Sequence, residues 1–82
     1  MKGIVKYFNP LNGFFAVEML PGEFSVIETS NLSYFKQGDV VEGNLNSLGS
    51  ESITNQSNGN TISVFIQDCS CSLSRVQQLF HS

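Results

Sequence analysis

Hydrophobic and polar residues alternate along much of this chain with the period of β-strands. Residues 2–8 (KGIVKYF) mix β-branched and aromatic residues with lysines. In residues 14–19 (FFAVEM), a strand would point Phe14, Ala16 and Glu18 to one face and Phe15, Val17 and Met19 to the other. Between them stand two turn dipeptides, Asn9-Pro10 and Asn12-Gly13. Proline fixes φ and glycine accepts positive φ, so both dipeptides favour tight turns. The first part of the chain therefore predicts a β-hairpin with one wetter face.

Three further strands are predicted after this hairpin. They are expected at residues 23–28, 40–48 and 61–69. In the last of them Ile62, Val64 and Ile66 alternate with Ser63, Phe65 and Gln67. Residues 49–60 (GSESITNQSNGN) carry a single hydrophobic residue, Ile53. A segment with so little apolar surface is expected to be a flexible hairpin tip.

The last residues of the chain predict a short helix. Its apolar positions fall on one helical stripe made of Leu73, Val76, Leu79 and Phe80. Ser74 and Gln77 have the spacing of a capping box. If the predicted strands close into a barrel, we expect this helix to pack across an open end of it, because short isolated helices are marginal. The alternatives are that the stripe docks on a partner or continues into a larger protein.

Residues 2–17, KGIVKYFNPLNGFFAV, resemble the opening of bacterial cold-shock domains, whose pattern is roughly KGxVKWFNxxKGFGFI. The resemblance implies an all-β fold, a five-stranded Greek-key barrel of the oligonucleotide-binding (OB) type. Residues 1–69 would form this cold-shock-like domain, and residues 70–82 would be an extension with the short C-terminal helix. Such domains bind single-stranded RNA or DNA and act as RNA chaperones without metal or cofactor, so the same function is expected here.

The resemblance also assigns roles to individual residues. Lys6 would contact phosphate, and Asn9 would hydrogen-bond a base edge or hold the turn. Tyr7 and Phe14 would stack on bases, since every base has a π face. In the loop after the third strand, Phe35 with the neighbouring Lys36 would add a further stacking surface. Alternatively, Phe35 or Tyr34 caps the barrel core, because aromatic side chains bury large areas.

The chain departs from the family pattern at several positions. In the first motif Tyr7 replaces a tryptophan, Asn12 a lysine, Phe15 a core glycine and Ala16 a second stacking phenylalanine. The second motif, typically VFVHF, reads EFSVIE over residues 23–28. In one register Phe24 and Val26 face the core, and in the other Phe24 lies on the binding face. Either register leaves a reduced aromatic platform.

Length and charge narrow the classes of function. Eighty-two residues support one small domain, and a net charge of −3 means that any affinity for nucleic acid must be local. The three lysines, Lys2, Lys6 and Lys36, all lie in the first half of the chain. No segment is long and apolar enough for a membrane helix, and the N-terminus lacks a signal-peptide layout, so a cytoplasmic location is expected.

The chemistry-bearing residues do not predict catalysis or a metal site. Cys69, Cys71 and His81 fall short of the four ligands of a structural zinc, and the cysteines are expected to be free thiols. The sequence has no nucleophile elbow, phosphate-binding loop or HExxH motif, so an enzyme is not expected.

A second function, from another class, competes with nucleic-acid binding. The chain could be a divergent barrel that has lost this activity and serves as a protein-interaction domain. Ile27 and Ala16 on the former binding face, the acidic charge and the apolar helical stripe favour it. A contiguous apolar patch on that face would support a protein partner, whereas rings clustered beside Lys6 would support nucleic acid.

Overall fold

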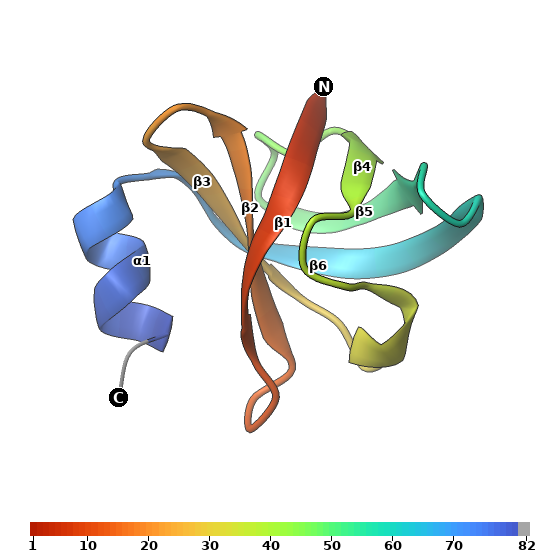
Figure 1. Cartoon of the computed structure of the whole chain (residues 1–82), viewed down its shortest axis with the longest axis horizontal. Helices are drawn as coiled ribbons and strands as arrows, with labels where there is room; N and C mark the ends of the chain where they lie inside the picture. Colours follow the sequence, from red (N-terminus) through yellow and green to blue (C-terminus); the bar gives the residue numbers. More distant parts are fainter. Residues whose placement is uncertain (81–82) are drawn as a thin grey trace.

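The computed structural model describes residues 1–80, which form a closed antiparallel β-barrel followed by one helix (Figure 1). The six strands are β1 (Lys2–Asn9), β2 (Phe14–Leu20), β3 (Glu23–Glu28), β4 (Val40–Gly43), β5 (Gly49–Asn55) and β6 (Asn60–Cys71). A short 3-10 helix, η1 (Leu32–Tyr34), precedes β4, and α1 (Leu73–Phe80) follows β6. The all-β barrel and the C-terminal helix are confirmed. No helix in this part of the chain is long and apolar enough to cross a membrane.

The expected count of five strands is wrong, because residues 1–80 form six. The strand predicted at 40–48 ends at Gly43, and β5 occupies most of the segment expected to be a flexible tip. Ile53 of β5 is fully buried, whereas Ser50 and Ser52 are exposed. An antiparallel strand with one solvated face needs few apolar residues. Only residues 56–59 remain as the tip.

The extra strand determines how the barrel closes. The strand order is β1-β2-β3-β6-β5-β4, and β4 returns to pair with β1. Every neighbouring pair is antiparallel. A closed ring of strands can be antiparallel throughout only when their number is even, so the sixth strand removes the parallel pair that five strands would require. The barrel thus consists of two three-stranded meanders joined by the segment that contains η1 (Figure 1).

Inward-facing side chains from both meanders form the barrel core. Phe15 lies at its centre, fully buried, with its ring stacked on Phe35 at 4.5 Å and on Phe8 at 6.1 Å. The other buried members are Val5, Val17, Ile27, Val41, Leu45, Ile53, Val64 and Ile66. At Gly3 a Cβ atom would lie 2.2 Å from Val17 Cγ1, so a larger residue cannot occupy this inward position without movement.

A β-bulge in β1 sets the direction of its side chains. Val5 pairs with Val17, but Tyr7 pairs with Ala16, so Lys6 is the additional residue on β1. As a result, Val5 and Phe8 pack in the barrel core, whereas Tyr7 packs in a second cluster on the outside. The bulge therefore brings the Lys6 and Tyr7 side chains together on the outer surface.

A buried amide anchors the connection between the two meanders. Asn55, fully buried, donates from Nδ2 to the Tyr34 carbonyl at 2.9 Å and to Asp39 Oδ2 at 2.7 Å. Its Oδ1 accepts from the Ser57 backbone N–H at 3.0 Å. Because these bonds tie the turn after η1 to the β5–β6 hairpin, they also fix where Phe35 and Lys36 lie.

Candidate nucleic-acid interface

The outer surface of the first meander carries a row of apolar and aromatic side chains, which we call the β1–β3 face. Its members are Tyr7, Phe14, Ala16, Phe24 and Val26. On β3, Phe24 and Val26 point outward, whereas Ile27 lies in the barrel core and Ser25 Oγ donates to the buried Leu45 carbonyl. The register that places Phe24 on the binding face is thus the observed one. The expectation that Ile27 lies on this face is wrong.

The helix α1 covers this face. Val76 is fully buried against it, and Leu79 and Phe80 are partly buried there. The Tyr7 ring lies 6.0 Å from the Phe24 ring and 6.3 Å from the Phe80 ring. Figure 1 shows α1 on the flank of the barrel beside β1 and β3, so the expected position across an open end is wrong. On this flank the apolar stripe of the helix meets the outward apolar side chains of β1, β2 and β3, which explains this placement.

Polar contacts at both ends of α1 are few. Ser72, not Ser74, accepts the first-turn bond, since its Oγ lies 3.2 Å from the Arg75 backbone nitrogen. Asn9 Nδ2 donates to the Leu79 carbonyl at 3.5 Å, and Arg75 Nε lies 4.0 Å from Asp68 Oδ2. The Asn9 side-chain amide, expected to hydrogen-bond a base edge, is therefore already bonded to α1.

The lysine beside the rings has an acidic neighbour. Lys6 Nζ lies 3.7 Å from Glu18 Oε1, and their side chains are 42% and 29% exposed. Glu18 Oε2 also accepts from the Gly22 backbone N–H at 3.1 Å, which holds this carboxylate near the β2–β3 turn. The positive charge that would attract phosphate is therefore partly neutralised in the free protein.

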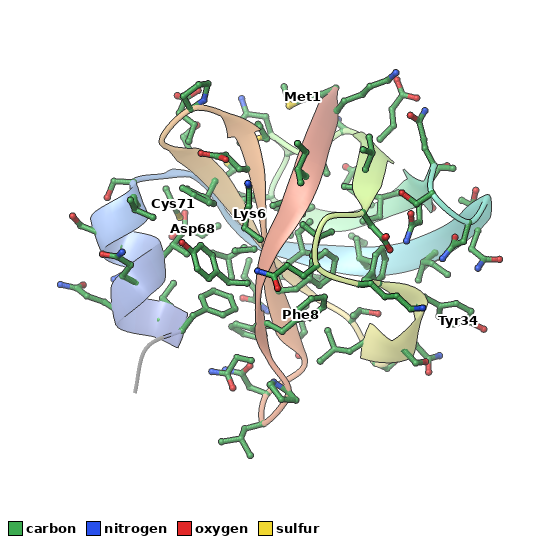
Figure 2. All side chains as sticks on the ribbon, viewed as in Figure 1. Met1, Lys6, Phe8, Tyr34, Asp68 and Cys71 are labelled. Carbon is green, nitrogen blue, oxygen red and sulfur yellow. The ribbon has the colours of Figure 1, made fainter. Side chains whose placement is uncertain are left out.

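The six residues expected to bind nucleic acid divide into two groups. Lys6, Tyr7, Asn9 and Phe14 lie together on β1 and β2. Phe35, only 4% exposed, is part of the barrel core, so the alternative that it caps the core is the one observed. Lys36 is exposed, and the next residue, Gln37, donates from Nε2 to the Lys6 carbonyl at 3.0 Å. The loop that carries Lys36 therefore runs beside β1 at Lys6, on the side of β1 where Figure 2 shows Tyr34 and opposite Cys71.

Both cysteines are free, as expected. Cys69 packs against the barrel core, and Cys71 is buried with Val76 under α1. Burial raises the pKa of the Cys71 thiol from 9.0 to about 11, with smaller contributions from a hydrogen bond to Asp68 and from its charge. Residues 1–80 contain no group of three His, Cys, Asp or Glu side chains that could hold a metal ion, and His81 lies outside the described residues.

The Cys71 thiol should make stability fall at alkaline pH. Because its folded pKa is raised, its contribution is complete below about pH 9 and is lost as pH rises toward about 11. We expect the free energy of unfolding to fall by about 1–3 kcal/mol over this range. Urea denaturation at pH 8 and pH 11 measures the loss, and Cys71→Ala should show a smaller one. Equal losses in both proteins would contradict the assignment.

A hollow of about 920 Å³ lies beside β3, β5 and β6 and borders the β1–β3 face, because Glu28 in its lining is the cross-strand partner of Phe14. Its lining includes Glu28, Glu51 and the ring of Phe65, which is 44% exposed, but no lysine or arginine from residues 1–80. The Glu28 carboxylate accepts a hydrogen bond from Gln67 Nε2. Two carboxylates without a cation repel phosphate, so this hollow is a poor nucleic-acid site.

No protein-family model matches the chain, and neither the curated proteins nor the solved structures provide a match. The similarity to cold-shock domains therefore rests on the sequence motif of residues 2–17 alone. Function is inferred from the side chains of this chain and their arrangement.

Proposed function

We propose that this protein binds single-stranded RNA or DNA through the β1–β3 face, as a divergent cold-shock-like OB barrel that contains a sixth strand. The observation that carries the proposal is the gathering of Tyr7, Phe14 and Phe24 on one surface next to Lys6 and Asn9. Aromatic rings beside a cation are the components of sequence-tolerant binding to single strands. We expect the protein to act in the cytoplasm as an RNA chaperone.

Each side chain has a defined task in this proposal. The rings of Tyr7 and Phe14 stack on successive bases, and Phe24 extends the platform on β3. Lys6 contacts a phosphate, while the Asn9 amide donates to a base edge or a phosphate oxygen. Stacking contributes about 1–3 kcal/mol per base irrespective of its identity, so little sequence preference is expected. Binding of this kind requires no hydrolysis, metal or cofactor.

Charge keeps the expected affinity low. The net charge is −3, and the Lys6 ammonium lies 3.7 Å from the Glu18 carboxylate. A single phosphate contact gives only a shallow dependence of affinity on salt. Stacking therefore supplies most of the binding free energy, and RNA and DNA pyrimidine oligonucleotides should bind in the same weak range.

Glu18→Gln should strengthen binding by releasing Lys6 for phosphate. An exposed ion pair is worth about 0.2–1 kcal/mol, so we expect a gain in affinity of about two- to five-fold at low salt. Fluorescence anisotropy with a labelled oligothymidylate measures it. Glu51→Gln makes the same change of charge on β5, away from the Lys6–Glu18 pair, and should have a smaller effect. Equal gains in the two variants would indicate a general charge effect, and no binding by any variant would refute the proposal.

The second candidate function, a protein-interaction domain, is favoured by the acidic hollow. The exposed ring of Phe65 and the carboxylates of Glu28 and Glu51 are suited to a basic segment of a partner. This surface is free in the described structure, whereas the β1–β3 face is covered. Absence of oligonucleotide binding in every variant would make this candidate the leading one.

A further inference from the structure

We propose that α1 is a displaceable cover on the β1–β3 face, which competes with a single strand for the same side chains. This inference rests on the proposed function. The competition follows from the contacts: Phe80 lies against Tyr7, and the Leu79 carbonyl accepts the hydrogen bond of the Asn9 amide. A base stacked on Tyr7 and a helix packed on Tyr7 exclude one another. Binding therefore requires that α1 move away.

The barrel does not depend on α1 for its core. The core residues of the barrel interior form one cluster, and Val76 belongs to a separate cluster on the outer surface. All six strand pairings are made without a residue of α1. Removing the helix from the face thus exposes apolar surface but leaves the core and the closed ring of strands intact.

The helix is held by few interactions. It has eight residues, and helices of this length are marginal in isolation. Val76 alone among its described residues is fully buried, and Leu73 remains 41% exposed. The Arg75–Asp68 pair is long, at 4.0 Å, and solvent-exposed. Segments with so few buried contacts open locally with a small free energy.

The connection to β6 allows this movement. Only Ser72 separates the end of β6 at Cys71 from the start of α1 at Leu73. Just before it, Ser70 has a φ of 57°, which turns the chain at the end of β6. Rotation about residues 70–72 would lift α1 while the rest of β6 stays paired with β3 and β5. The same rotation would uncover Cys71, which lies beneath the helix.

Covering lowers the apparent affinity in a calculable way. If only the open form binds, the apparent dissociation constant is the intrinsic one divided by the open fraction. A substitution in α1 that changes the open fraction must then change affinity by the same factor. Alkylation of Cys71 without nucleic acid reports the open fraction independently, because its rate is proportional to that fraction when closing is fast.

The test uses the full chain with Cys69→Ala, so that Cys71 is the single thiol. Val76→Ala removes buried methyl groups and should open α1. Ser74→Ala, Gln77→Ala and Gln78→Ala, combined, raise helix propensity at exposed positions without changing charge, and should close it. Leu73→Ala, at a partly exposed position of the same helix, is the matched control. Circular dichroism verifies that each barrel is folded.

Affinity for an oligothymidylate and the alkylation rate of Cys71 should change together. Val76→Ala should raise both about tenfold, from the loss of buried apolar surface. The triple alanine variant should lower both about fivefold. Leu73→Ala should change neither by more than about twofold.

Two kinds of result would overturn the proposal, and they are distinguishable. If the alkylation rate of Cys71 changes among the variants while the affinity stays constant, α1 opens without governing binding. The proposed function would then stand. Alkylation that does not respond would show that α1 is not a mobile cover. Absence of binding in all variants, including Val76→Ala, would remove the proposed function itself and direct the search to a protein ligand for the exposed face.

Discussion

Replacing Phe15 by glycine, the residue of the cold-shock pattern at this position, is expected to unfold the barrel. Phe15 is fully buried and stacks on both Phe8 and Phe35. Truncation of a buried phenylalanine destabilises a protein by about 3–5 kcal/mol, and the flexibility of glycine within a strand adds to this. Small domains are stable by only about 5–15 kcal/mol, so most of the stability would be lost.

Thermal unfolding followed by circular dichroism measures this effect. Phe65→Gly provides the matched control, because Phe65 is also in a strand but its side chain is 44% exposed. It should lower the melting temperature far less. A Phe15→Gly variant that melts like the wild type would contradict the structure, because the space around Phe15 would then have to be filled in another way.

Replacing Tyr7 and Phe14 by leucine should abolish most of the affinity for single strands while the fold is retained. Leucine keeps apolar packing under α1 but removes the aromatic faces. Since each stacked base is worth about 1–3 kcal/mol, the double variant should bind oligothymidylate roughly a hundredfold more weakly. Fluorescence anisotropy gives the affinity, and Cys71 alkylation verifies that α1 still covers the face to the same extent.

Phe65→Leu is the control for this experiment. It removes an aromatic side chain of comparable size from the hollow, on β6, two strands away from Phe14 across β3. We expect its affinity to match that of the wild type. If Phe65→Leu reduces binding and the Tyr7/Phe14 double variant does not, the single strand binds at the hollow and the β1–β3 face has another role.

The sequence predicts the first meander better than the second. Two runs rich in β-branched and aromatic residues flank the turn dipeptides Asn9-Pro10 and Asn12-Gly13, and the hairpin of β1 and β2 forms where expected. The hairpin of β5 and β6 is harder to predict, because β5 has a single large apolar side chain, Ile53, on its inner face and serines on its outer face. Low hydrophobicity in that segment reflects a solvated strand face rather than flexibility.

The site is predictable only where neighbouring strands determine it. Tyr7, Asn9 and Phe14 meet because β1 and β2 are adjacent and in register. The position of Phe35 depends on a loop that could place its ring either outside or in the core, and the Asn55 bonds that fix this loop come from β5. The apolar stripe of α1 signals burial, but no periodicity in the sequence identifies the surface that it covers.

An NMR titration of the labelled protein with a short oligopyrimidine, in DNA and RNA forms, tests the proposed surface most directly. We expect shifts at Lys6, Tyr7, Asn9 and Phe14 that weaken with salt, together with shifts along α1 as the helix leaves the face. The shifts should saturate at a lower oligonucleotide concentration in Val76→Ala. A folded barrel that shows no shifts at high micromolar oligonucleotide, or shifts only around Glu28, Glu51 and Phe65, would contradict nucleic-acid binding by the β1–β3 face.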